Sequence, residues 1–300
     1  MAISPIDHYS LFETVPTTIG EVKAFIDEVE AAAIRLEADV YWRGQTDHSW
    51  GVTSSLSRLG DTPTVLTDHD LRDAESALIQ EAMRWVTSLA NPPVNELEWL
   101  ALLQHMSIPT RLIDFTPDPL IATFFASEAN DEVEGRLFAI LIPKKNAPLA
   151  DASHFRINEL DQGEIRLWAP PVALSPRVAA QRGVFALGRL PSTAPRRLVR
   201  DPESPGAQRH MLRSEVVSVM SVPLAITSLG NRSMPYAKGV RCYTARVHVD
   251  KAALREQLAK RAKRGALRPA GAPIDYAYCY PDVEGMLRYS RVLARVKRGL

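Results

Sequence analysis

The chain has 300 residues, 46% of them hydrophobic, and its formal net charge is +1. This composition is typical of a globular protein, and the near-zero charge argues against a large electrostatic footprint on nucleic acid or membrane. The two cysteines form no CxxC pair, which argues against a structural zinc site and favours a reducing compartment. We therefore expect a cytoplasmic protein without a metal site. The N-terminus shows no signal-peptide pattern, and no apolar run is long enough to span a membrane.

The first third of the chain is predicted to be mainly helical. Apolar residues at helical spacing predict helices over 18–38 and 68–90, and Thr18 and Glu21 have the spacing of a capping box at the start of the first. A third helix should begin after Asn95, which is a suitable N-cap residue. These helices are expected to pack through one apolar face.

A strand is predicted over residues 40–45, where β-branched and aromatic residues precede Gly44. Side chains alternate along a strand, so Tyr41 and Arg43 should share one face. A charged Arg43 at the end of an apolar strand needs an anionic partner or access to water.

Residues 99–126 form the most informative stretch of the sequence. Pro109 ends one helix and Pro119 begins another that is apolar nearly all round, so a short polar loop lies between two buried helices. The loop carries four polar residues: Thr110, Arg111, Asp114 and Thr116. Polar groups held between apolar segments need partners or a ligand. The structural alternative is that Arg111 and Asp114 pair with each other or cap the two helices.

The second half of the chain is richer in predicted strands. Apolar runs predict strands at 136–142, 183–187, 215–222 and 240–249, and Gln181 lies at the entrance of the second of these. Residues 189–210, rich in Pro, Arg and Ser, are predicted to be a flexible surface loop.

Two further helices are predicted near the C-terminal end of the sequence. One is basic and covers 250–263, and the other should pack through Met286, Leu287, Tyr289 and Leu293. Helices early and strands late indicate an α+β fold. We expect one domain over 1–300, with its core at about 20–295 and one mixed or antiparallel sheet.

Four blocks of the sequence together resemble one family, the FRG domain. They are Tyr41 to Gln45, Leu103 to Thr116, Ala180 to Phe185 and Tyr280 to Gly285. The first contains the aromatic-Arg-Gly triplet Trp42-Arg43-Gly44. The second is similar to the family's Gln-His-x-x-x-Pro-Thr-Arg-Leu-x-Asp-aromatic-Thr signature.

The FRG pattern is itself similar to that of ADP-ribosyltransferases, which implies an ADP-ribosyltransferase-like fold and NAD as substrate. The resemblance places Arg43 at the position that binds the phosphates or ribose of NAD, and Gln181 at the position of the catalytic Glu. It implies that NAD is bound by Tyr41, Arg43, Gly44, Arg111 and Thr116. It implies that catalysis involves Gln181, Asp114 and His105. We expect Arg43, Arg111, Asp114 and Gln181 to converge on one cleft.

Gln181 is the main departure from the transferase pattern. Transfer of ADP-ribose passes through an oxocarbenium-like state, which a carboxylate stabilises and a neutral amide does not. Either Asp114 or Glu284 supplies that charge, or the protein is not a transferase of this type.

Three functions follow as hypotheses. The first is an NAD-dependent ADP-ribosyltransferase or NAD glycohydrolase acting as a toxin or defence effector, with a protein or nucleic-acid acceptor and a neutralising partner. The second is a non-catalytic nucleotide- or nucleic-acid-binding module, in which Tyr41, Trp42 and Trp50 stack on bases. The third is a hydrolase with His105 as general base, although a histidine beside a helix end is more often structural.

Overall fold

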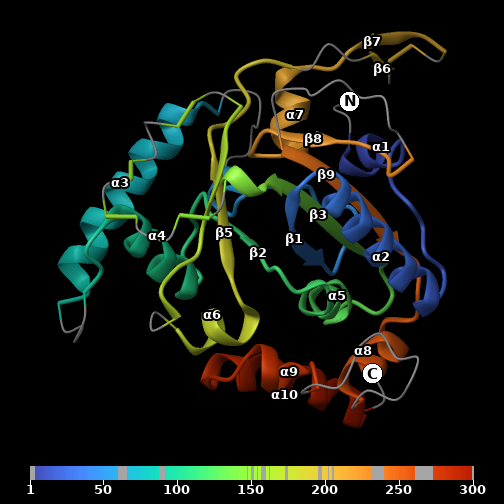
Figure 1. The fold of residues 1–300 in the computed structure, drawn as a ribbon. Helices are drawn as coiled ribbons and strands as arrows, with labels where there is room; N and C mark the ends of the chain where they lie inside the picture. The colour runs from blue at the N-terminus through green and yellow to red at the C-terminus, as the bar shows by residue number, and fades with distance from the viewer. Residues whose placement is uncertain are drawn as a thin grey trace.

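The computed structural model describes these residues: 4–59, 66–87, 92–146, 148–149, 152–153, 155–156, 160–161, 163–172, 175–194, 198–201, 203–204, 206–230, 240–260 and 273–298. The elements confirm the expected α+β class (Figure 1). No helix among these residues is both long and apolar enough to cross a membrane.

The larger sheet has four strands in the order β1-β3-β9-β8. They are β1 (Ala38–Gln45), β3 (Gly135–Pro143), β9 (Val240–Val247) and β8 (Leu224–Ile226). β1, β3 and β9 pair antiparallel, whereas β8 runs parallel to β9. The sheet is therefore mixed, as expected.

A second sheet of three antiparallel strands has the order β2-β5-β4. It contains β2 (Ile113–Phe115), β5 (Val184–Gly188) and β4 (Ile165–Trp168). The prediction of one sheet was wrong, because the 183–187 strand belongs here. Trp42 of β1 and Thr116, directly after β2, form a bridge between the sheets: each backbone N–H donates to the other residue's carbonyl, at 2.7 and 2.8 Å.

The alternation of side chains on β3 divides the hydrophobic core into layers. Leu137, Ala139 and Leu141 point toward α2 (Ile19–Arg35), α5 (Pro119–Ser127) and α8 (Lys251–Ala259). The intervening Phe138, Ile140 and Ile142 point to the other side, where they pack with residues of the second sheet. Successive side chains of a strand point to opposite faces, which explains why β3 reads as a continuous apolar run although it serves two cores.

The far face of the second sheet is covered by two more helices. Phe185, Leu187 and Trp168 pack with residues of α4 (Glu96–His105), and α3 (Asp68–Trp85) lies beside α4. The layers therefore run helix, sheet, sheet, helix, with α3 and α4 on the left of Figure 1. This arrangement places the ends of β1 and β2 side by side.

The predicted helix starts agree with the structure. The Thr18 side chain accepts from the backbone N–H of Glu21 at 3.2 Å, and Asn95 accepts from that of Glu98 at 3.0 Å. Each cap satisfies a backbone donor that the first turn of a helix leaves without a partner. Trp85 is the exception to the expected apolar face of α3: it shares helical spacing with the buried Leu71 and Ala82 but is 82% exposed.

The predicted strand at 215–222 is a helix, α7 (Arg213–Val219). Glu215 accepts from the backbone N–H of Leu212 at 2.8 Å, which caps the first turn, and the valines that follow are buried. A short apolar run fits a buried helix as well as a strand, so its periodicity alone could not decide.

The predicted loop at 189–210 contains a small hairpin of β6 (Leu198–Arg200) and β7 (Gln208–His210), at the top of Figure 1. Residues 195–197, 202 and 205 lie outside the described residues, so the prediction of flexibility stays a prediction.

Two helices lie near the C-terminal end of the chain, α9 (Tyr276–Cys279) and α10 (Val283–Arg298). α9 contacts both α10 and the earlier helix α6 (Pro176–Gln181). The predicted packed face of α10 was wrong, since Met286 is 74% exposed and Leu287 59% exposed. α10 instead makes a close contact at Gly285, where an added Cβ would lie 2.2 Å from the Tyr280 carbonyl oxygen.

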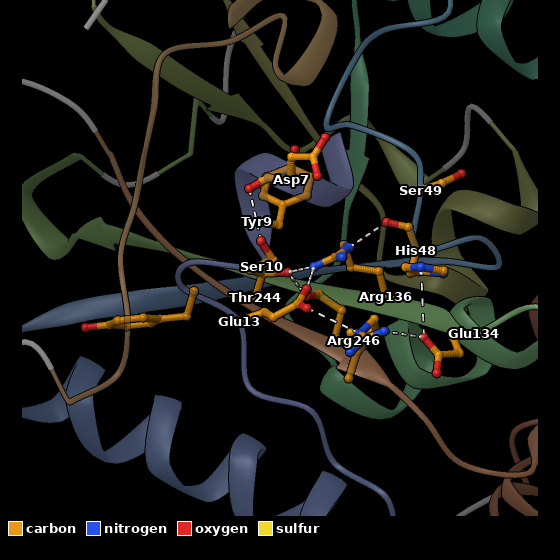
Figure 2. A network of polar contacts seen from close by, with 12 residues as sticks. Asp7, Tyr9, Ser10, Glu13, His48, Ser49, Glu134, Arg136, Thr244 and Arg246 are labelled. Atoms are coloured by element: carbon orange, nitrogen blue, oxygen red, sulfur yellow. Dashed lines mark hydrogen bonds and ion pairs between the residues drawn. The ribbon is translucent and has the colours of Figure 1, made fainter. Parts of the chain in front are cut away.

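A buried network of charges joins the N-terminal segment, after α1 (Pro5–Tyr9), to the larger sheet (Figure 2). Glu13 pairs with Arg136 of β3 at 2.6 Å and with Arg246 of β9 at 3.2 Å. Glu134 pairs with Arg246 at 3.1 Å, and the Nε of Arg136 donates to the His48 carbonyl at 2.8 Å. Buried charges require such partners, and here they fix the loop after β1 against the sheet.

Candidate functional site

A cavity of about 270 Å³ opens where β1 and β2 meet. Its walls come from five parts of the chain: the end of β1, α4 with β2, α5, α6, and the α9–α10 region. The predicted residues that line it are Arg43, Gly44, His105, Asp114, Thr116 and Gln181. The predicted convergence of Arg43, Asp114 and Gln181 is therefore found, whereas Arg111 lies elsewhere.

Arg43 reaches from β1 to β2 across the bridge between the sheets. Its Nη1 donates to the Asp114 backbone carbonyl at 3.0 Å and lies 3.9 Å from the carboxylate oxygen Oδ2 of Asp114. Its Nε is buried and has no hydrogen-bond partner among the described residues. A buried N–H without a partner is costly, so this part of the guanidinium is suited to a ligand acceptor.

Asp114 lies in β2 rather than in a loop as predicted, and its carboxylate points into the cavity. Gln104 Nε2 donates to Asp114 Oδ1 at 2.7 Å, and the Gln104 oxygen accepts from the Thr110 hydroxyl at 2.5 Å. The protein around the cavity raises the pKa of Asp114 above its ordinary value by desolvation, while the charge of Arg43 and the bond from Gln104 oppose the rise. The Asp114 side chain is nevertheless 64% exposed to solvent, so its carboxylate is accessible.

Thr116 and Gly44 line the cavity beside the bridge. The Thr116 hydroxyl accepts from the backbone N–H of Asp118 at 3.1 Å, which leaves its hydrogen for another partner. Gly44 is required for packing, because an added Cβ would lie 1.8 Å from the Ala122 carbonyl oxygen of α5. Its place in the sequence pattern thus has a structural cause: any larger residue would push α5 away from β1.

His105 is the last residue of α4 and lines the cavity. Its Nδ1 is 3.5 Å from the Ser175 hydroxyl, which itself accepts from the backbone N–H of Arg177 and caps α6. The contact is at the outer limit of a hydrogen bond, and Ser175 is engaged as a cap. This geometry favours a structural role for the pair over a serine–histidine nucleophile.

Gln181 is the last residue of α6, so its predicted place at a strand entrance was wrong. Arg182 follows in the left-handed conformation at φ 51° and ends the helix before β5 begins. The Gln181 Nε2 donates to the Cys279 carbonyl at 2.8 Å. Its amide therefore holds α6 against α9, and its oxygen can accept from a ligand.

The part of the cavity wall formed by α6, Tyr280 and α10 contains lining residues that the sequence reading missed. Arg177 forms a two-pronged pair with Asp282 at 2.6 and 2.8 Å. The Arg177 and Arg288 guanidinium carbons lie 5.2 and 5.1 Å from the centre of the Tyr280 ring. The only signal was the Tyr280-to-Gly285 block, which marked the region without showing that it lines the same cavity as Arg43.

Glu128 contacts two residues of this wall, Tyr280 and Arg288. It accepts from the Tyr280 hydroxyl at 2.6 Å and lies 3.9 Å from Arg288. Burial raises the pKa of Glu128, and the Tyr280 hydrogen bond and nearby cations oppose that rise. The side chain of Glu284, the other predicted carboxylate, lies outside the described residues.

Arg111 and Tyr41 do not line the cavity, which corrects two predicted binding residues. Arg111 is 2% exposed and pairs with Glu75 at 2.7 Å and Asp68 at 3.2 Å, both from α3. Its charge is therefore neutralised inside the protein, by α3 and not at this cavity. Tyr41 is 8% exposed and packs in the core between the two sheets.

Within the described parts of the chain, no three His, Cys, Asp or Glu side chains gather as a metal site would require. The described residues that line the cavity offer a carboxylate, two amides, three hydroxyls, an imidazole and guanidinium groups.

Residues 38–135 match the family model of the FRG domain. The match contains the Trp42-Arg43-Gly44 triplet and the signature from Gln104 to Thr116, and it supports the resemblance to that family. It ends before α6 and α9, so it covers the Arg43 side of the cavity and not the Gln181 side. No curated protein and no solved structure matches the chain.

Proposed function

We propose that the cavity binds NAD and that the protein cleaves the bond between nicotinamide and ribose, passing ADP-ribose to an acceptor or to water. The observation that carries the proposal is the joint presence of Arg43, Asp114 and Gln181 in one cavity. These residues come from β1, β2 and α6, and their positions in the sequence are those that resemble the ADP-ribosyltransferase pattern. The two-sheet core, which brings them together, supports the same proposal.

Asp114 has the role that Gln181 cannot perform. Among the described residues that line the cavity, Asp114 alone carries a carboxylate. When the bond between ribose C1′ and nicotinamide breaks, its electron pair leaves with nicotinamide and the ribose becomes positively charged. A fixed carboxylate beside that charge lowers the barrier. The acceptor oxygen or nitrogen then bonds to C1′ and loses its proton to Asp114 or to solvent.

Arg43, Gln181 and Thr116 are suited to the remaining groups of NAD. The Arg43 guanidinium has a buried N–H without a protein partner and suits a phosphate or a ribose hydroxyl. The Gln181 oxygen and the Thr116 hydroxyl suit ribose hydroxyls. The cavity of about 270 Å³ is near the lower end of small-molecule sites, so it encloses one nucleoside half and leaves the other half outside.

The test is NAD turnover by the full chain, with nicotinamide release as the measurement. We expect release by the wild type and a loss of about 100-fold or more in Asp114→Asn, which keeps the shape and removes the charge. Asp73→Asn is the matched control, because Asp73 is 68% exposed on α3 and pairs only with His69 among the described residues. Equal turnover in both variants would contradict the role of Asp114.

The second candidate is a nucleotide-binding module without catalysis. The observation that favours it is Gln181, a neutral amide already bonded to the Cys279 carbonyl at the position where the transferase pattern has a carboxylate. Binding of NAD by calorimetry without release of nicotinamide, weakened in Arg43→Gln, would support this function over the first.

A further inference from the structure

A second cavity of about 450 Å³ shares no lining residue with the first and takes no part in the proposed chemistry. It is lined by Ser49, Trp50, Gly51, Thr53, Ser57, Arg58, Val217 and Ser218. Its volume is within the range of small-molecule sites, and its described lining contains a cation and no carboxylate. Such a lining attracts anions.

Trp50 provides an exposed aromatic surface at this cavity, since half of its area (50%) is open to solvent. The loop that carries it is held at several points. Lys251 Nζ donates to the Thr46 carbonyl at 2.6 Å, and the backbone N–H of His48 donates to the Glu134 carbonyl at 2.8 Å. The His48 carbonyl accepts from Arg136 Nε at 2.8 Å (Figure 2). The Trp50 ring is therefore attached to a rigid backbone, which favours stacking because little freedom is lost on binding.

Gly51 fixes the floor of the cavity. An added Cβ at Gly51 would lie 2.3 Å from the Val219 carbonyl oxygen, so the loop presses directly on α7. The Gln45 side chain donates to the Gly51 carbonyl at 3.0 Å and closes the loop on β1. The cavity thus lies between three packed elements, which preserves its shape.

Arg58 supplies the positive charge. Its Nη1 donates to the Thr53 carbonyl at 2.6 Å, which orients the guanidinium, and among the described residues no carboxylate pairs with it. Arg182 and Arg84, in contrast, lie within ion-pair distance of Asp118 and Glu81. An oriented arginine without a protein anion is suited to a phosphate.

Of the three serine hydroxyls in this lining, those of Ser57 and Ser218 have their hydrogens engaged. Ser57 donates to the Ser54 carbonyl at 2.9 Å, and Ser218 donates to the Glu215 carbonyl at 2.8 Å. A hydroxyl that donates inward presents its oxygen as an acceptor. These oxygens suit the N–H and O–H groups of a nucleoside.

We propose that this second cavity binds one nucleotide, with the base stacked on Trp50 and the phosphate paired with Arg58. Stacking on an aromatic residue tolerates every base, so the site recognises the nucleotide class rather than one base. Such a nucleotide is either free or part of a single strand. The proposal does not depend on NAD turnover, because none of its residues lines the first cavity.

The test is calorimetric titration of the full chain with AMP and with a single-stranded oligoadenylate of about eight nucleotides. We expect binding, weakened about tenfold or more by Trp50→Ala and by Arg58→Gln. The matched controls are Trp85→Ala and Arg84→Gln on α3, whose side chains are 82% and 75% exposed. Thermal melts should show all four variants folded.

The same titration in Arg43→Gln protein separates the two cavities. Binding of AMP should persist there and weaken about tenfold or more when Arg58→Gln is added. Binding of the oligoadenylate alone, with the same dependence on Trp50 and Arg58, supports a nucleotide read within a strand. The proposal is overturned if neither probe binds, if both variants bind like the controls, or if Arg43→Gln alone abolishes binding.

Discussion

The Arg43 guanidinium lies closer to the backbone carbonyl of Asp114 than to the carboxylate of Asp114. The guanidinium donates to the Asp114 carbonyl at 3.0 Å, while the distance to its carboxylate oxygen is 3.9 Å. Because the carbonyl positions the cation, the Asp114 side chain remains directed by Gln104 and open to the cavity. The two residues thus place opposite charges side by side without a tight pair that a ligand would have to break.

The first prediction concerns Arg43→Gln. We expect the variant to fold with a loss of about 1 kcal/mol, because it removes one hydrogen bond near the end of β1. NAD turnover should fall about 100-fold, since the cation facing the ligand is lost. A thermal melt and nicotinamide release measure both effects, with Arg84→Gln as the control. A normal melt together with full turnover would show that Arg43 does not serve the site.

The second prediction concerns Arg111→Met, which should destabilise the protein without acting on the site. Removing Arg111 leaves the Glu75 carboxyl, 1% exposed, without the cation that offsets its burial, and breaking a buried pair costs about 3–5 kcal/mol. Urea unfolding measures the loss, and adding Glu75→Leu should recover part of it. NAD affinity per folded molecule should be unchanged. A stable variant with weaker NAD binding would restore Arg111 to the binding site.

The local features of the fold could be predicted because they depend on neighbouring residues. The caps at Thr18 and Asn95, and the strand that carries Trp42 and Arg43, follow from patterns within a few positions. The division into two sheets could not, because it depends on distant strands: β2 pairs with β5, and it meets β1 at the bridge between Trp42 and Thr116. Nothing near either residue indicates that the other lies beside it.

The site was predictable only where the resemblance supplied long-range information. Arg43, Asp114 and Gln181 meet as expected, but Arg111 was misplaced because its partners lie 36 and 43 positions earlier, on α3. A buried arginine and a ligand-binding arginine look the same in sequence until their partners are known. Arg177 and Arg288 were missed for the converse reason, since helices far along the chain bring them to the cavity.

The third prediction concerns Lys251→Met on α8. The Lys251 ammonium donates to three carbonyls, those of Thr46 at 2.6 Å, Ala129 at 2.8 Å and Asn130 at 2.9 Å. Methionine keeps the packing and leaves these oxygens without their donor, so we expect a loss of about 3 kcal/mol in urea unfolding. Lys260→Met is the control, because Lys260 is 55% exposed. Equal stability of the two variants would exclude the anchoring role.

The last prediction concerns the pH dependence of NAD turnover. Asp114 must be ionised to stabilise a positive ribose, and desolvation raises its pKa above the ordinary value of about 3.8. Activity should therefore rise with pH through this raised pKa and decline below it. Gln104→Met removes the 2.7 Å bond that favours the charged form, so the pKa should increase and the acid limb should move to higher pH. Well above that limb, turnover should return toward the wild-type rate. The measurement is kcat/KM against pH, with Gln80→Met, at an exposed position of α3, as the control. An acid limb that stays in place or moves to lower pH in Gln104→Met would show that another group controls the profile.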